Sequence, residues 1–269
     1  MQAVGNGRLK KKSVNWRVHK KGREDRKPDK QHRQPFERTV LDYIFPRRCV
    51  VCDEPSDQRE KGVCRKCQEK IVYIRAPFCM KCGKAVRDAE DAYCEDCRKK
   101  THVFLQGTAV FDYGSMADSI FRFKYGGRQE YAHFYGREMY ERKKEWLAAI
   151  KPDALIPVPI HSSRKRKRGY NQAEVLARAL SEHCGIPVYA DLIGRTQKTL
   201  PQKNLTRRER QNILKKAFKI LRNDVKLSTI VIIDDIYTTG STIDAVATTL
   251  QEAGITKIYH MTLAAGRGI

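Results

Sequence analysis

The stretch IVIIDDIYTTGST, Ile230 to Thr242, combines a strand, an acidic pair and a helix start in a fixed order. Ile230 to Ile233 is an unbroken run of β-branched residues, which is typical of a strand buried on both faces. Asp234 and Asp235 follow at the carboxyl end of that strand. A helix is expected from about Ser241 to Ala253, because apolar residues recur there at helical spacing. This order indicates an α/β fold with a buried strand.

The segment between the strand and the helix is suited to an anion. Thr238, Thr239, Gly240, Ser241 and Thr242 bring four hydroxyls and a glycine to a helix start, where backbone N–H groups are free. The two carboxylates cannot bind a phosphate, so they would face sugar hydroxyls or a phosphate-bound Mg²⁺. The segment therefore indicates a sugar phosphate. The competing interpretation is an ordinary capped helix, which needs one hydroxyl and no acidic pair.

Charge is distributed unevenly along the 269 residues, which carry a formal net charge of +23. Residues 1–38 hold 13 Lys and Arg against 4 Asp and Glu, a net charge of +9, with few apolar residues. Such a segment buries too little surface to offset its ordering entropy, so we expect a disordered basic tail. It could lie along nucleic acid or an anionic membrane surface, or be solvated without a partner.

Targeting signals are not recognisable in the chain. The N-terminus has no apolar core of the kind that secretory signals need, and no apolar run is long enough to span a bilayer. A Walker A sequence is also absent, so ATP hydrolysis is not encoded. We expect a cytoplasmic protein, with a peripheral position at the membrane left open by the basic tail.

Eight of the nine cysteines form Cys-x-x-Cys pairs that repeat every 15 residues. Two such pairs make a four-thiolate Zn²⁺ site, and disulfides are disfavoured in a chain without an export signal. We therefore expect two structural Zn²⁺ ions. Sequential pairing is the most economical arrangement, and nested pairing stays open. The expected ligands are Cys49, Cys52, Cys64, Cys67, Cys79, Cys82, Cys94 and Cys97.

Strands and helices alternate from about residue 105 to the end, which favours a mostly parallel sheet flanked by helices. The chain then divides into a basic tail (1–38), a zinc region (39–100) and an α/β domain (101–269). The expected strands are 154–160, 217–220, 230–233 and 257–264, with another after residue 103, and the expected helices are 114–124, 131–146, 171–180 and 241–253.

A second chemical segment, IPVPIHSSRKRKRGYNQ, spans Ile156 to Gln172. Ligands of parallel sheets bind beyond the carboxyl ends of the strands, and this segment follows a buried strand as the acidic pair does. We expect a loop here, in which Arg164 or Arg168 could grip a phosphate by bidentate contact. A solvated basic loop, or one that touches nucleic acid, is the alternative. Another basic element, 202–212, could cover the site or face a partner.

The acidic motif resembles the phosphoribosyl pyrophosphate (PRPP) motif of type I phosphoribosyltransferases. The ordered set of zinc knuckles, FRFKYGGR (Phe121 to Arg128), the Ile156–Gln172 segment, TLPQKNLTRRERQNILKKAF and the acidic motif resembles the ComF (ComFC) family over residues 45–268. The resemblance implies a type I phosphoribosyltransferase-like domain that binds PRPP with Mg²⁺. Asp234 and Asp235 would hold the ribose hydroxyls, and residues 238–242 would hold the 5′-phosphate.

The same resemblance assigns Ser162, Ser163 and Arg164 to PRPP, and Arg164 and Arg168 to the leaving pyrophosphate. It implies a part in natural transformation, handling incoming single-stranded DNA beside a helicase or another DNA-processing partner. An active phosphoribosyltransferase of nucleotide metabolism and a PRPP-sensing regulator are the alternatives. No pattern in the chain identifies the acceptor nucleophile, the oligomeric state or the role of the tail.

Overall fold

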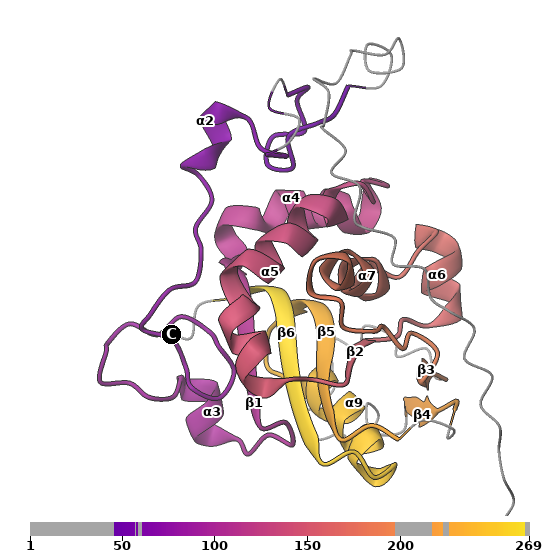
Figure 1. Ribbon diagram of the computed structural model, residues 1–269. Coiled ribbons are helices and arrows are strands. Elements are labelled where there is room, and N and C mark those ends of the chain that lie inside the picture. The colour runs from indigo at the N-terminus through magenta and orange to yellow at the C-terminus, as the bar shows by residue number, and fades with distance from the viewer. Residues whose placement is uncertain (1–45, 57, 59–60, 197–216, 223–225, 267–269) are drawn as a thin grey trace, which may run out of the picture.

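The computed structural model describes residues 46–56, 58, 61–196, 217–222 and 226–266 (Figure 1). The basic tail of residues 1–38 and the basic element 202–212 lie outside these residues. The described elements are α2 (Arg65–Gln68), α3 (Glu95–Lys99), β1 (Gln106–Asp112), α4 (Tyr113–Tyr125), α5 (Tyr131–Ile150), β2 (Ala154–Pro157), α6 (Ser162–Arg168), α7 (Gln172–Cys184), β3 (Ile193–Arg195), β4 (Phe218–Ile220), β5 (Thr229–Tyr237), α9 (Ser241–Glu252) and β6 (Lys257–Ala265).

Within the described residues, the main sheet has four strands in the order β1-β6-β5-β2, and all of its pairs are parallel. The last strand of the chain, β6, therefore lies inside the sheet between β1 and β5. Parallel order brings all four carboxyl ends to one edge, where ligands of such sheets bind. The predicted mostly parallel α/β fold is confirmed.

Residues of β5 alternate between two cores, which explains the unbroken β-branched run. Val231 and Ile233 pack in the cluster that contains α4, α5 and α7, while Ile230 and Ile232 pack in the cluster that contains α9. Successive side chains of a strand point to opposite faces, so both faces need apolar residues here. Figure 1 shows α4, α5 and α7 together on one side of the sheet.

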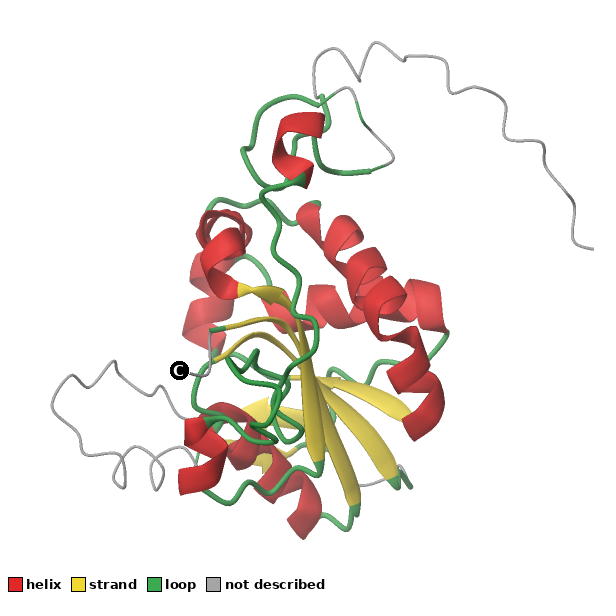
Figure 2. Cartoon of the chain, turned by 90° about the vertical axis from the view of Figure 1, so that its left-hand side faces the viewer, coloured by secondary structure: helices red, strands yellow, loops and turns green. Residues whose placement is uncertain are grey.

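The two groups of cysteines join different cores. Cys49 and Cys67 pack in the cluster with α4 and α5, whereas Cys79, Cys82 and Cys94 pack in the cluster with α9. Figure 2 shows that this part of the chain is mostly loop, and its helices α2 and α3 have only 4 and 5 residues. The two groups of cysteines thus belong to the two cores that lie on opposite sides of the sheet.

The expected loop at 161–168 is wrong in its local structure, because Ser162–Arg168 forms helix α6. His161 caps the helix by accepting a hydrogen bond from the Ser163 N–H, and Gly169 ends it at a φ of 84°. Arg and Lys are good helix formers, which a charge-based interpretation of the run overlooked.

Other boundaries shift by a few residues. Strand β5 continues through the acidic pair to Tyr237, and β2 ends at Pro157 rather than at Ile160. A separate antiparallel hairpin pairs β3 with β4. Among the described residues, no helix has the length and apolar content that crossing a membrane requires.

Candidate functional site

The acidic pair lies near the carboxyl end of β5, beside the end of β2. The register pairs Pro157 with Ile233, so the chain leaves β2 next to the point where β5 reaches Asp234. The backbone N–H of Asp235 donates to a carboxylate oxygen of Asp234 at 2.9 Å. The expected position of the pair at the edge of the sheet is therefore found.

Lys124, on the last turn of α4, forms an ion pair with Asp235, with 2.8 Å between Nζ and Oδ1. Both side chains are largely buried, with 17% and 14% of their surface exposed. In the sequence, Lys124 stands out only as part of the FRFKYGGR segment, and no local pattern indicates a role for it. The available signal was a cation at the end of a helix, and only the fold brings it to the acidic pair.

The protonation of Asp234 is shifted by its surroundings. Burial raises the pKa of the Asp234 carboxyl, and the neighbouring charge of Asp235 raises it further, to about 7. Lys124 and Arg195 act in the opposite direction without cancelling this effect. The pair therefore has one carboxyl that exchanges its proton near neutral pH.

Gly240 shapes residues 238–242, the segment that is expected to hold the 5′-phosphate and is called the phosphate loop below. It caps α9 with a φ of 72°, a conformation that favours glycine. A Cβ atom there would lie 2.4 Å from the Tyr237 hydroxyl and 2.9 Å from Cε1 of His102. Thr238 and Thr239 are exposed beside it, and the hydroxyls of Thr239 and Ser241 lie 3.0 Å apart. The loop thus presents hydroxyls and the N-terminus of a 12-residue helix to solvent.

Arg195, on β3, interacts electrostatically with Asp234 of the acidic pair and with Arg164 of α6. Burial lowers the pKa of Arg195, the positive charge of Arg164 lowers it further, and Asp234 opposes both. Arg164 and Arg195 therefore both act electrostatically at this edge. No motif in the sequence indicated Arg195, because its strand has only three residues.

The two ends of α6 differ in their contacts. Ser163 lies at the start of the helix with its hydroxyl 2.8 Å from Nδ1 of His161, and Ser162 is exposed next to it. Arg168, at the other end, donates to Gln172 at 3.0 Å and to the Tyr125 hydroxyl at 2.8 Å. The structure thus directs Arg168 toward α4, and its assignment to pyrophosphate stays a prediction.

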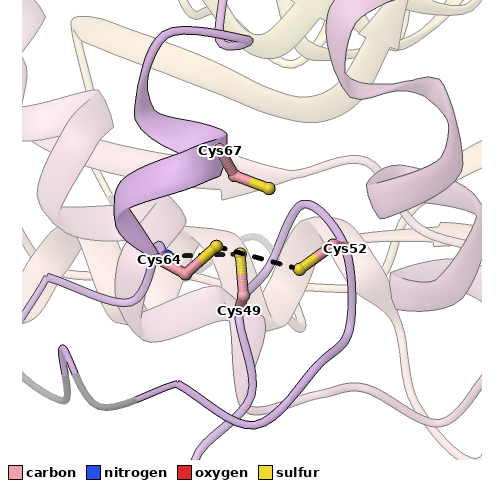
Figure 3. A group of neighbouring side chains, drawn as sticks. All are labelled: Cys49, Cys52, Cys64 and Cys67. Carbon is pink, nitrogen blue, oxygen red and sulfur yellow. Dashed lines mark hydrogen bonds between the residues drawn. The ribbon is translucent and has the colours of Figure 1, made fainter.

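The eight paired cysteines form two sequential groups, which settles the question of sequential or nested pairing. In each group the four sulfur atoms lie within 4.8 Å of one another, and all are free thiols. Figure 3 shows the first group, Cys49, Cys52, Cys64 and Cys67, with the side chains directed toward one another. Four converging thiols fit one tetrahedral Zn²⁺ ion in each group.

The first cysteine group is tied to the helix that carries Lys124. Asp53, which follows Cys52 in a left-handed conformation with a φ of 63°, accepts hydrogen bonds from Arg128 at 2.8 Å and Tyr131 at 2.5 Å. Burial alone would raise the pKa of Asp53, but these two partners outweigh it and lower the pKa. Arg122 donates to the Val51 carbonyl at 2.5 Å. The FRFKYGGR segment therefore bridges this group and the acidic pair.

The second cysteine group borders the phosphate loop. The segment that leaves it supplies Lys100 and His102, which both contact the Asp244 carboxylate in the first turns of α9; His102 Nδ1 lies 2.9 Å from it. The Val103 N–H donates to the same carboxylate at 3.1 Å. Burial would raise the pKa of Asp244, but hydrogen bonds from His102 and Lys100 hold it below its ordinary value. The start of α9 is therefore anchored to this group.

Comparisons with known protein families match both the α/β region and the cysteine region. A family model described as a phosphoribosyl transferase domain matches residues 139–268. A model described as a double zinc ribbon domain matches residues 40–98. The chain is thus a protein with a phosphoribosyl transferase-type α/β domain that is preceded by a double zinc ribbon.

Individual relatives are more specific than these domain descriptions, because they are competence and DNA utilization proteins. Competence protein F of Haemophilus influenzae is 29% identical over 228 residues, 82% of this chain and 98% of that protein. Competence protein ComFC of Bacillus subtilis is 26% identical, covering 77% and 89% of the two chains. The DNA utilization protein YhgH of Escherichia coli K12 is 28% identical, covering 78% and 92%. The chain is therefore a homologue of the ComF-type competence and DNA utilization proteins over most of its length.

Proposed function

We propose that the chain binds PRPP with Mg²⁺ at the acidic motif and handles incoming single-stranded DNA in natural transformation. One observation supports PRPP as the ligand. The carboxyl-terminal edge of the sheet combines a carboxylate pair, a helix N-terminus with a left-handed glycine, and basic side chains. Asp234 and Asp235 would accept hydrogen bonds from the ribose 2′- and 3′-hydroxyls. Residues 238–242 would hold the 5′-phosphate through N–H and hydroxyl groups.

The pyrophosphate would lie toward α6. Ser162, Ser163 and Arg164 at the start of this helix would contact it, and Arg195 adds a cation that lies close to Arg164 and Asp234. When bound, Mg²⁺ would neutralise charge on the pyrophosphate oxygens. The basic side chains would stabilise the charge that develops on a leaving pyrophosphate. Arg168, at the other end of α6, would also stabilise the charge of the leaving pyrophosphate.

The DNA role is supported by the names of the relatives, which are competence and DNA utilization proteins. It is also supported by the net charge of +23, because cations that neutralise phosphates dominate binding to nucleic acid. We place the protein in the cytoplasm, with the basic tail able to reach an anionic membrane surface, and we expect a helicase or another DNA-processing protein as a partner.

Two other functions fit the same site. An active phosphoribosyltransferase would transfer ribose 5-phosphate from PRPP to an acceptor, and the intact acidic pair and loop favour the PRPP binding that each of these functions needs. A PRPP-sensing regulator would bind PRPP without turnover. Pyrophosphate release in the presence of PRPP, Mg²⁺ and candidate acceptors separates the enzyme from the two binding functions.

Titration calorimetry with Mg²⁺–PRPP tests the site itself. The double variant Asp234→Asn, Asp235→Asn should bind at least about tenfold more weakly, a loss of about 1.4 kcal/mol. The matched control is Asp118→Asn, Asp191→Asn, which removes two exposed carboxylates elsewhere and should bind as the unaltered protein does. Equal affinity in the two double variants would refute the proposed site.

A further inference from the structure

Two aromatic side chains stand exposed on the helix that supplies Lys124. Phe121 and Tyr125 of α4 are 62% and 58% exposed, although large apolar side chains are usually buried. They are four residues apart, so they share one face of the helix, and their ring centres lie 5.1 Å apart. Phe123 between them points into the core and is fully buried. The helix thus keeps one aromatic ring for the core and offers two to solvent.

Arg168 fixes one of these rings. Its guanidinium carbon lies 4.6 Å from the centre of the Tyr125 ring, and one of its nitrogens donates to the Tyr125 hydroxyl at 2.8 Å. A second nitrogen donates to the Gln172 side chain at 3.0 Å. Tyr125 is therefore held between α4 and α6 before any partner binds, which lowers the entropy cost of binding.

The surroundings of the two rings are cationic. Arg168 ends α6, whose last five residues, 164–168, are all Arg or Lys. Arg166 and Lys167 are exposed, whereas Lys165 lies near Glu174, with 3.6 Å between the charged atoms. On the other side, Lys124 leads to the acidic pair through its bond to Asp235. Exposed aromatic rings beside a run of cations match a polymer that has both bases and phosphates.

We propose that Phe121, Tyr125 and Arg168 form a stacking platform for the bases of single-stranded DNA, with the phosphates on α6. The proposal rests on the single-stranded DNA partner of the proposed function and names where the bases bind. A free nucleobase fits less well, because small-molecule sites enclose most of the ligand and these rings are more than half exposed. A second copy of the chain also fits less well, because a symmetric contact through this surface would bring the cations of the two α6 helices together.

Three aromatic residues near the cysteines, Tyr73, Phe78 and Tyr93, are less suited to base stacking. The Tyr73 hydroxyl donates to Glu138 at 2.9 Å, and Arg142 covers its ring at 3.7 Å, so both its polar and its flat surfaces are occupied. Phe78 and Tyr93 are 38% and 49% exposed, and neither belongs to a described pair of neighbouring rings. The platform on α4 therefore adds a site that was not apparent from the sequence.

Fluorescence anisotropy with a labelled 20-nucleotide oligothymidylate tests the platform in the full-length, zinc-loaded protein. The variant Phe121→Ala, Tyr125→Ala should bind at least about fivefold more weakly, since stacking contributes about 1–3 kcal/mol per base. Phe121→Tyr, Tyr125→Phe keeps both rings and should bind normally. Leu105→Ala removes an apolar side chain that is 48% exposed elsewhere, and it should also bind normally.

An abasic oligonucleotide of equal length separates bases from phosphates. The unaltered protein and the double alanine variant should bind it equally, because it has no bases to stack. Photocrosslinking of a 5-iodouracil oligonucleotide to the unaltered protein should place the adduct on Phe121 or Tyr125, and this readout needs no folded variant. Adducts confined to other residues would overturn the platform.

The outcomes distinguish the platform from the function on which it rests. If the unaltered protein binds the oligonucleotide and the double alanine variant binds equally well, the platform is wrong and the DNA function stands. If the unaltered protein does not bind at low salt, both fail. If light scattering shows a dimer that the alanine variant loses, the rings are a contact between copies, and the proposal is also overturned.

Discussion

Asp244 offers a sharp test of whether the second cysteine group holds the phosphate loop. Its carboxylate, 14% exposed, contacts Lys100, His102 and the Val103 N–H, and it belongs to the helix that Gly240 caps. His102 also lies against Gly240, where a Cβ atom would be 2.9 Å from Cε1 of the ring. The substitution Asp244→Asn keeps the size of the side chain and one acceptor but removes its charge.

The loss of folding free energy follows from the positive charge of Lys100, which Asp244→Asn leaves without its carboxylate partner. Lys100 is only 16% exposed, and removing one partner of a buried ion pair costs about 3–5 kcal/mol. We take the lower value, about 3 kcal/mol, because both side chains retain some contact with water. For a folded region of this size about 1 kcal/mol corresponds to 2–4 °C, so the Tm should fall by about 6–12 °C. The protein should stay folded, since domains are stable by about 5–15 kcal/mol.

Calorimetry should also show Mg²⁺–PRPP affinity reduced by at least about tenfold, because the loop loses its anchor. Lys100→Met, Asp244→Asn removes both charges and should regain most of the stability, since replacing both partners can be nearly neutral. Glu252→Gln, at the exposed far end of the same helix, is the matched control and should change neither value. An Asp244→Asn variant with normal Tm and normal PRPP affinity would refute this coupling.

The remaining predictions concern zinc, protons and salt. Metal analysis should find close to two Zn²⁺ per chain, and chelation should weaken PRPP binding as well as unfold residues 49–97, because the second cysteine group shares a core with α9; a metal-free protein with an intact fold would contradict this. Asp234 has a pKa of about 7, above its ordinary value, so ionising it costs folding free energy as pH rises from about 4 to 7. Asp234→Asn should therefore raise the Tm more at pH 8 than at pH 5, whereas the exposed control Asp118→Asn should not show this difference. Binding of single-stranded DNA should weaken with salt at a log–log slope of about −0.7 per phosphate neutralised. Deletion of residues 1–38, which carry +9 of the +23, should flatten that slope; an unchanged slope would move the binding site to the rest of the chain.

Local patterns in the sequence were sufficient for the elements of the site. The β-branched run, the acidic pair and Gly240 identify a strand, its carboxyl end and a helix start, because each depends on neighbours within a few residues. The 15-residue repeat of the cysteine pairs predicted the ligands of both zinc sites for the same reason. The roles assigned to individual residues at PRPP, and the division of the chain at about residue 100, stay predictions.

Contacts between distant segments were decided only by the tertiary structure. Lys124 reaches Asp235 across 111 positions, and Lys100 reaches Asp244 across 144, because helix packing and parallel strand order bring their segments together. Arg195 comes to the site on a three-residue strand that has no signal of its own. The pKa of Asp234 depends on burial at the edge of the sheet, which no spacing encodes.

The cysteine region shows the same division between local and distant information. The sequence by itself determined which cysteines form the four Cys-x-x-Cys pairs, since spacing within a knuckle sets their geometry, but it left sequential and nested grouping of these pairs open. Only the folded chain determined that one group packs with α4 and α5 and the other beside α9. Each group is too short to bury a core of its own, so its position depends on the apolar faces of the sheet and helices that cover it.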